Sequence, residues 1–322
     1  MTPHDPSGTF PSGSSSRRIG IDDVRRIEAV TARCRDTDYR RGGDAGRDDI
    51  LTCLHASRPL TEAAMTEHVR TSLQVALADL HTLAGWTCFD VGDLTRARSH
   101  LDQALTLARE AGNDDLAANI HYRLGRIHLH HLQPSQALAR FQLGEQLARR
   151  SATPRTVSLL LVNQAWAHAR MGAEQPALTA LDQAHETFAA IGPGPAPPWS
   201  AFFDATDFDS ITGVVYTELA QHTDTSYTSF ALPALTRAVN SFGDDMARSR
   251  AFCLIMLAIN HLIEGDVEHG AKIGIQAVVT SSALTSTRTK DRMKPLANEA
   301  YRHRDTTRAR DLADHITRFT QS

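Results

Sequence analysis

The chain has 322 residues, of which 41% are hydrophobic and 22% are charged, and its formal net charge is −3. This composition is typical of a soluble globular protein with ample material for a core. The near-neutral balance argues against a broad basic face that grips nucleic acid, and no apolar run approaches the roughly 18 residues that a membrane span requires. The four scattered cysteines form no CxxC pair and suit a reducing compartment. We therefore expect a cytoplasmic protein that contacts neither membrane nor nucleic acid directly.

The N-terminal part of the chain divides into a leader and two predicted helices. Residues 1–19 are rich in Ser, Pro and Gly and lack the apolar centre of a secretory signal, which predicts a disordered leader. Residues 20–60 follow, with short helices predicted over 21–35 and 48–54. A polar, glycine-containing turn at 40–44 separates the two helices.

Residues 61–191 contain an internal repeat. A small residue recurs every 40 residues, at positions 85, 125 and 165, and a larger apolar residue recurs with it at 101, 141 and 181. A small residue on one helix lets a second helix approach closely, and the larger residue fills the remaining gap. Because the same sizes recur at the same offsets, this region is predicted to form three antiparallel helix hairpins.

The remaining third of the chain begins with a loop. Residues 192–203 contain four prolines and cannot be helical, so we expect a long extended loop that returns Trp199, Phe202 and Phe203 to the repeats. Residues 204–322 are predicted to form two degenerate hairpins, 204–222 with 227–241 and 248–264 with 267–281, and a capping helix at about 306–319. The bases scattered between Arg288 and Arg310 alternate with acids, which predicts a solvated surface.

The predicted fold class is therefore all-α, an α-solenoid of tetratricopeptide-like hairpins, about five pairs plus the capping helix. Four local patterns in the sequence are similar to those of a known family. They are IDDV at 21–24 with RRGG at 40–43, LAGW at 83–86 with DVG at 90–92, PPWSAFFD at 197–204, and GDVE at 265–268. With these, residues 20–321 resemble the tetratricopeptide-repeat regulatory region of actinomycete helix-turn-helix (XRE-type) transcriptional regulators.

That resemblance implies a regulatory role and homodimerisation. Members of the family begin with a DNA-binding helix-turn-helix, whereas this sequence has the predicted leader in that place. Direct DNA binding is therefore not carried over to this chain, and the readout is expected to be a partner.

The first helix of each hairpin should build a concave inner wall. Helical spacing from the aligned small residues predicts ten positions on this wall, which we call the inner-wall set: Asp79, Trp86, Asp90, Asn119, Tyr122, Arg126, His130, Trp166, Arg170 and Tyr216. Arg can bind a carboxylate, Asn can hold a peptide backbone, and aromatic rings can stack on an apolar group. The set therefore predicts a groove for a peptide, a small molecule or a partner protein. The alternative is that Trp86 and Trp166 simply pack between neighbouring helices.

Histidine is unusually frequent, at 16 residues. His128, His168, His222 and His261 occupy equivalent repeat positions, where a partly buried ring with one hydrogen-bonded nitrogen is expected. His128, His130 and His131 also cluster, which raises metal binding as an alternative. Equivalent positions lie too far apart to share one ion, and no Cys or carboxylate completes a set. The sequence thus predicts neither a metal nor a cofactor.

Standard catalytic signatures are missing from the sequence, which has no GxSxG elbow, HExxH, phosphate-binding loop or GxGxxG. The leading hypothesis is a non-enzymatic regulatory protein whose groove senses a ligand. The alternatives are a scaffold that joins two proteins without sensing, and a metal-binding protein or enzyme that uses the histidines.

Overall fold

The structure of the protein is a computed structural model that describes residues 18–284 and 286–321. In these ranges the chain is all-α, with fourteen α-helices and three short 3₁₀ turns. The helices are α1 Ile21–Arg41, α2 Arg47–Ser57, α3 Glu67–Asp90, α4 Leu94–Glu110, α5 Asp114–His130, α6 Pro134–Arg150, α7 Pro154–Arg170, α8 Glu174–Ala189, α9 Ala205–His222, α10 Thr228–Ser241, α11 Ala247–Ile263, α12 Val267–Ser282, α13 Thr287–Arg302 and α14 Thr307–Gln321.

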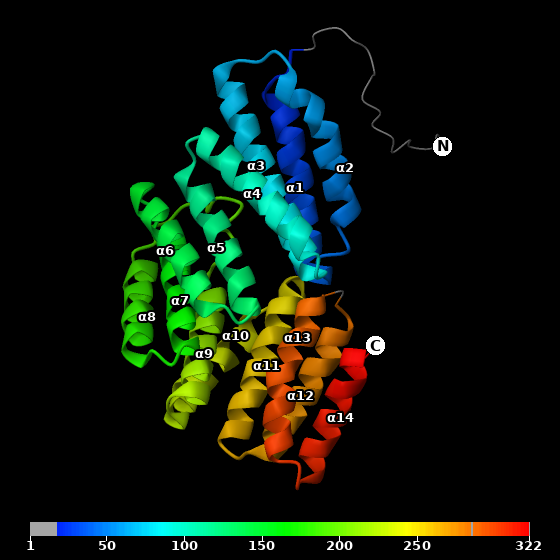
Figure 1. The fold of residues 1–322 in the computed structure, drawn as a ribbon, viewed down its shortest axis with the longest axis vertical. Coiled ribbons are helices and arrows are strands. Elements are labelled where there is room, and N and C mark those ends of the chain that lie inside the picture. Colours follow the sequence, from blue (N-terminus) through cyan, green and yellow to red (C-terminus); the bar gives the residue numbers. More distant parts are fainter. Residues whose placement is uncertain (1–17, 285, 322) are drawn as a thin grey trace, which may run out of the picture.

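The helices pack as successive hairpins, from α1/α2 to α13/α14 (Figure 1). This confirms the predicted fold class, an all-α tetratricopeptide-like solenoid. The small residues act as predicted where the helices of a hairpin cross. A Cβ atom on Gly85 would lie 2.8 Å from Cγ of Leu101, and one on Gly125 would overlap the ring of Phe141. Each glycine therefore sets a close approach between two helices.

The solenoid curves until its ends meet. In Figure 1 the lower ends of α1 and α3 approach the upper ends of α11 and α13, although these helices lie far apart in the sequence. Helix α1 contacts α11 directly. The inner wall is thus enclosed by both ends of the chain.

The N-terminal elements differ from the prediction. Residues 1–17 of the predicted leader lie outside the described residues, but Ile19 is buried at 3% exposure, and its amide donates to the carbonyl of Ala64. The boundary predicted after residue 19 is therefore wrong. Helix α1 is also longer than predicted and continues to Arg41, because its buried face packs on α3 along much of its length.

A second difference lies near the C-terminus. The capping helix corresponds to α14, but α13 was not predicted, so α13/α14 form a further hairpin. Helix α13 contains Pro295 and carries few apolar residues, and its buried face includes Arg288 and Thr289 beside Met293 and Leu296. A hydrophobic pattern cannot reveal a helix that turns charged side chains inward.

One segment, Asp244–Ile263, is long and apolar enough to cross a membrane by length and composition, but 61% of its most apolar window is buried inside the protein. It includes α11, which packs against α9, α12 and α13. This central position accounts for its apolar composition.

Candidate functional site

The inner-wall set was predicted to be exposed, and for several members this is wrong. Trp86, Tyr122 and Trp166 are 6%, 4% and 3% exposed. The curvature of the solenoid and the 192–203 loop cover them with other parts of the same chain. Both covers come from segments distant in sequence, so helical spacing alone could not reveal them.

The loop lies on the inner wall of the first repeats. Trp199 donates its indole N–H to Asp115 at 2.7 Å, and its carbonyl accepts a hydrogen bond of 3.1 Å from the amide of Asn119. The ring of Phe202 stacks on Tyr122 at 6.0 Å. The sequence predicted that Asn119 would bind the backbone of a peptide. In the structure its side chain binds the backbone of the loop instead.

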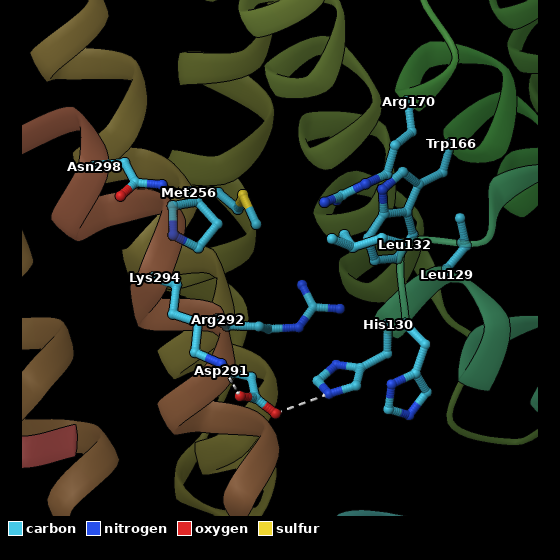
Figure 2. Close-up of a pocket in the computed structure, with 12 residues that line it drawn as sticks. Leu129, His130, Leu132, Trp166, Arg170, Met256, Asp291, Arg292, Lys294 and Asn298 are labelled. Carbon is cyan, nitrogen blue, oxygen red and sulfur yellow. Dashed lines mark hydrogen bonds and ion pairs between the residues drawn. The ribbon is translucent and has the colours of Figure 1, made fainter. Parts of the chain in front are cut away.

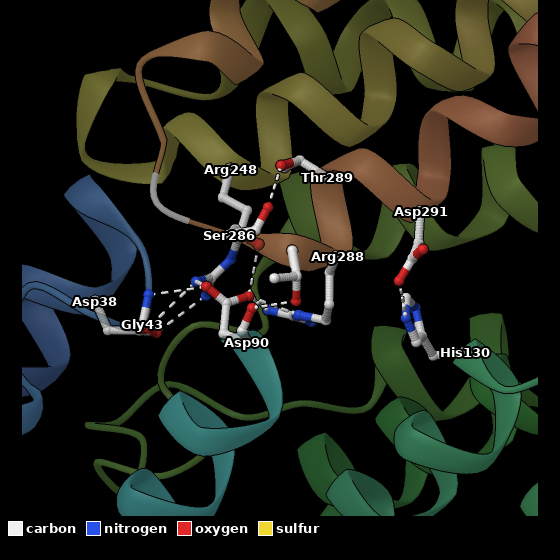
Figure 3. A network of polar contacts seen from close by, with 10 residues as sticks. Asp38, Gly43, Asp90, His130, Arg248, Ser286, Arg288, Thr289 and Asp291 are labelled. Carbon is white, nitrogen blue, oxygen red and sulfur yellow. Dashed lines mark hydrogen bonds and ion pairs between the residues drawn. The ribbon is translucent and has the colours of Figure 1, made fainter. Parts of the chain in front are cut away.

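Two other members of the set form buried ion pairs, and one of them, Asp90, joins the two ends of the solenoid. Asp79 pairs with Arg35 of α1 at 2.5 Å. Asp90 is fully buried and forms ion pairs with Arg248 at 3.1 Å and Arg288 at 2.6 Å. Figure 3 shows that the side chains around Asp90 come from both ends of the chain. These two carboxylates therefore hold the fold together instead of lining an open groove.

Asp90 is the centre of a polar network. It also accepts hydrogen bonds from the amide of Gly43 and the hydroxyl of Ser286, both at 2.8 Å, while Arg248 reaches Asp38 at 3.0 Å. Burial alone would raise the pKa of Asp90, but the two guanidinium groups and the two hydrogen bonds outweigh it and hold the pKa well below its ordinary value.

An open cavity of about 560 Å³ lies between the α5–α6 turn and helices α7, α11 and α13 (Figure 2). Three members of the inner-wall set line it: His130, Trp166 and Arg170. Trp166 and Arg170 both donate to Glu218, at 3.1 and 2.6 Å. These contacts fix one wall of the cavity.

The opposite wall comes from α11 and α13, with Met256, Asp291, Arg292 and Lys294 among its side chains. Sequence reasoning missed these residues. The bases from Arg288 to Arg310 were predicted to lie on a solvated surface. For Arg288 and Arg292 this is wrong, because Arg288 is 3% exposed and the Nε of Arg292 is buried. The available signal was their spacing of four residues, which places both on one helical face.

The two walls differ in electrostatics. Burial, followed by the charges of Arg292 and Arg288, lowers the pKa of His130 to about 4, although its ring contacts Asp291 at 3.1 Å. Burial, followed by the charges of Arg126, Arg288 and Arg170, lowers the pKa of Arg292 to about 9. At neutral pH the imidazole is therefore uncharged and the guanidinium remains a cation.

The last two members of the set lie outside this cavity. Arg126 stacks on Trp166 at 4.6 Å and lines a smaller interior space of about 70 Å³ with Arg123 and Arg288. Tyr216 stacks on Tyr227 and Phe230, at 6.0 and 5.3 Å. The ten predicted residues thus serve the buried ion pairs, the loop, the cavity, the smaller interior space and the α9/α10 aromatic cluster, and they do not form one continuous groove.

The clustered histidines do not converge on one point. His128 contacts Gln133 at 2.8 Å, and His130 contacts Asp291. Among the described residues, the group that could hold a metal ion is His261, Asp266 and His269, whose ligand atoms lie within 4.8 Å of one another. Sequence reasoning found no carboxylate beside His261. The signal it missed was the close sequence spacing of the three residues across the α11–α12 turn.

Fold and site together define a tetratricopeptide-like helical repeat protein. No protein-family model and no curated protein sequence matches the chain. Among solved structures, it is similar to a Rap protein in complex with competence and sporulation factor, with a TM-score of 0.53 and 11% sequence identity. The match covers 92% of this chain and 96% of that chain. At this identity the likeness concerns the fold alone.

Proposed function

We propose that this chain is a non-enzymatic regulatory protein that binds a peptide or small molecule in the cavity between α7 and α13. The observation that carries the proposal is a ligand-sized cavity lined by aromatic, aliphatic and cationic side chains inside a repeat solenoid. The similar Rap protein was crystallised with a bound factor, which supports a binding role for this architecture. The sequence resemblance to the regulatory region of actinomycete XRE-type regulators supports a regulatory one.

Helix α13 links the cavity to the contact between the two ends of the solenoid. Arg288 at the start of α13 pairs with Asp90 of α3, and Arg292 one turn later lines the cavity. A ligand that shifts α13 would therefore act on the contact between the two ends of the solenoid. In repeat proteins small rotations add up along the array, so a change in curvature is the proposed output.

The remaining expectations belong to the same proposal. The four cysteines are free, which supports a reducing cytoplasm. The net charge of −3 supports a chain that does not itself bind nucleic acid. The output is read by a partner, and the family resemblance favours a homodimer.

The test is a thermal-shift measurement with separated small-molecule, peptide and protein fractions of a cell extract. Stabilisation by a small-molecule or peptide fraction is expected, because a ligand that binds only the folded state raises the melting temperature. Asn298→Trp should abolish the shift, since Asn298 is exposed and lines the cavity, so the indole would fill the space. Tyr301→Trp is the matched control, because Tyr301 is 62% exposed and lies outside the cavity.

The outcomes separate the hypotheses. A shift that survives in Asn298→Trp would place the ligand elsewhere. A response to protein fractions alone would support the scaffold hypothesis in place of ligand sensing.

A further inference from the structure

Arg292 is a half-buried cation without an acidic partner. Its Nε is buried and makes no hydrogen bond, and among the described residues no carboxylate lies within ion-pair distance of it. Its guanidinium is instead held by two rings, 4.5 Å from the centre of Phe252 and 5.2 Å from that of Trp166. Figure 2 shows this group pointing into the cavity, between His130 and the Trp166–Arg170 wall.

The neighbourhood of Arg292 has an excess of positive charge. Arg126 donates only to neutral oxygens, those of Tyr122 at 3.3 Å and Asn163 at 3.4 Å. Arg170 shares Glu218 with Trp166, and Lys294 pairs with Asp291 at 2.7 Å. Of these side chains, Arg170 and Lys294 form ion pairs with carboxylates, whereas no ion pair is found for Arg126 or Arg292 among the described residues. His130 is uncharged at neutral pH.

Comparison with Arg288 shows that the contact between the two ends of the solenoid does not use the charge of Arg292. Arg288 lies one turn earlier on the same face of α13 and uses its guanidinium to bind Asp90. Arg292 has no equivalent acid. A partly desolvated cation with no acid beside it opposes folding, so the position is poorly suited to a purely structural role. A cation of this kind aimed into a cavity is suited to an external anion.

We propose that the cavity binds the carboxylate of a ligand that carries an apolar group beside it, as the C-terminal residue of a peptide does, and that Arg292 is the primary contact. This inference rests on the proposed ligand-binding function and names the chemistry of its ligand. The guanidinium fork can donate two parallel hydrogen bonds to one carboxylate. Leu129, Trp166, Met256 and Pro295 supply an apolar wall for the neighbouring side chain.

The charge and the wall together favour a carboxylate over a free phosphate. Phosphate would satisfy the cations, but it would leave the apolar wall without a partner. The cavity volume of about 560 Å³ matches that of small-molecule sites, so it would hold the end of a peptide and not a whole folded partner.

The probes for the test are N-acetyl-leucine, its uncharged amide and inorganic phosphate, each titrated into the full chain by calorimetry. N-acetyl-leucine should bind with a dissociation constant on the order of 1 mM, as expected for a ligand of this size. The amide should bind at least about tenfold more weakly, because the charged hydrogen bonds are lost. Phosphate should bind more weakly than N-acetyl-leucine.

Two variants assign the effect to Arg292. Arg292→Met keeps an unbranched apolar stem but removes the guanidinium, and it should weaken N-acetyl-leucine binding by roughly 10- to 100-fold. Its melting temperature should equal or exceed that of the wild type, because a partly desolvated cation without an acidic partner has been removed. Arg308→Met is the matched control, since Arg308 is 61% exposed on α14 and does not line the cavity, and it should bind nearly as the wild type does.

The inference is overturned if N-acetyl-leucine does not bind, if the amide or phosphate binds equally well, or if Arg292→Met binds normally or unfolds. These results are distinguishable from a failure of the proposed function. If N-acetyl-leucine fails but an extract fraction still stabilises the wild type and not Asn298→Trp, the function stands and only the ligand chemistry is wrong. If no fraction acts, the proposed function fails as well.

Discussion

Gly125 and Phe141 show how one side chain sets the distance between two helices. The hydrogen on Gly125 Cα is all that separates the backbone of α5 from the ring of Phe141, which is fully buried. In the neighbouring repeats the same two positions hold Gly85 with Leu101 and Ala165 with Leu181. The sizes of the two residues are therefore coupled within each hairpin.

At this position we expect Gly125→Ala to lower the free energy of unfolding by about 1–3 kcal/mol through overpacking, despite the roughly 1 kcal/mol that Ala gains over Gly in a helix. Adding Phe141→Leu reproduces the third repeat and should recover part of the loss, with a coupling energy of about 1 kcal/mol or more in a double-mutant cycle. Urea denaturation provides the measurement. Gly192→Ala, where a Cβ meets nothing within 4 Å, is the control, and simple additivity of the two changes would refute the coupling.

At the scale of elements, the loop between α8 and α9 behaves as a piece of the core. Phe203 is fully buried, and Trp199 joins the loop to α5 through Asp115 and Asn119. Pro residues keep this segment extended, which leaves its carbonyl groups available to side chains of the inner wall. The loop therefore occupies space that an unbent solenoid would leave open.

Replacing the anchor should release this loop without melting the helices. In Trp199→Ala we expect cleavage within residues 192–203 by a dilute protease to accelerate roughly tenfold or more, because local opening becomes easier, while far-ultraviolet circular dichroism stays unchanged. Trp199→Phe retains the ring but cannot donate to Asp115, so its rate should fall between the two. Equal cleavage rates in all three proteins would show that Trp199 does not anchor the loop.

At the scale of the whole molecule, the Asp90 network holds the two ends of the solenoid together. It connects α1 and α3 with α11 and α13 through Asp38, Asp90, Arg248 and Arg288. Removing one charge from such a buried group leaves the others uncompensated, which is strongly destabilising. The network is therefore the natural place to test whether closure is needed for the fold.

Asp90→Asn should cost about 3–5 kcal/mol of unfolding free energy at pH 7 and raise the radius of gyration measured by small-angle scattering. Asp22→Asn is the control, because Asp22 forms an exposed pair with Arg25. The native pKa of Asp90 is depressed. Its contribution to the free energy of unfolding is therefore complete above the unfolded pKa of about 4 and is lost as the pH falls below that value. The difference between wild type and Asp90→Asn should therefore shrink below about pH 4. A constant difference, or an unchanged radius, would contradict this role.

The sequence by itself determined the all-α class, the hairpin repeat and most helix positions, because sizes at the helix crossings and the proline-rich break are local properties. It also placed His130, Trp166 and Arg170 on the inner wall. Only the tertiary structure decided which inner-wall residues stay open, that α13 exists, and that Arg288 and Arg292 point inward. The curvature of the solenoid brings together residues such as Asp90 and Arg288 that are far apart in the sequence, and buried charges carry no hydrophobic pattern that would reveal them.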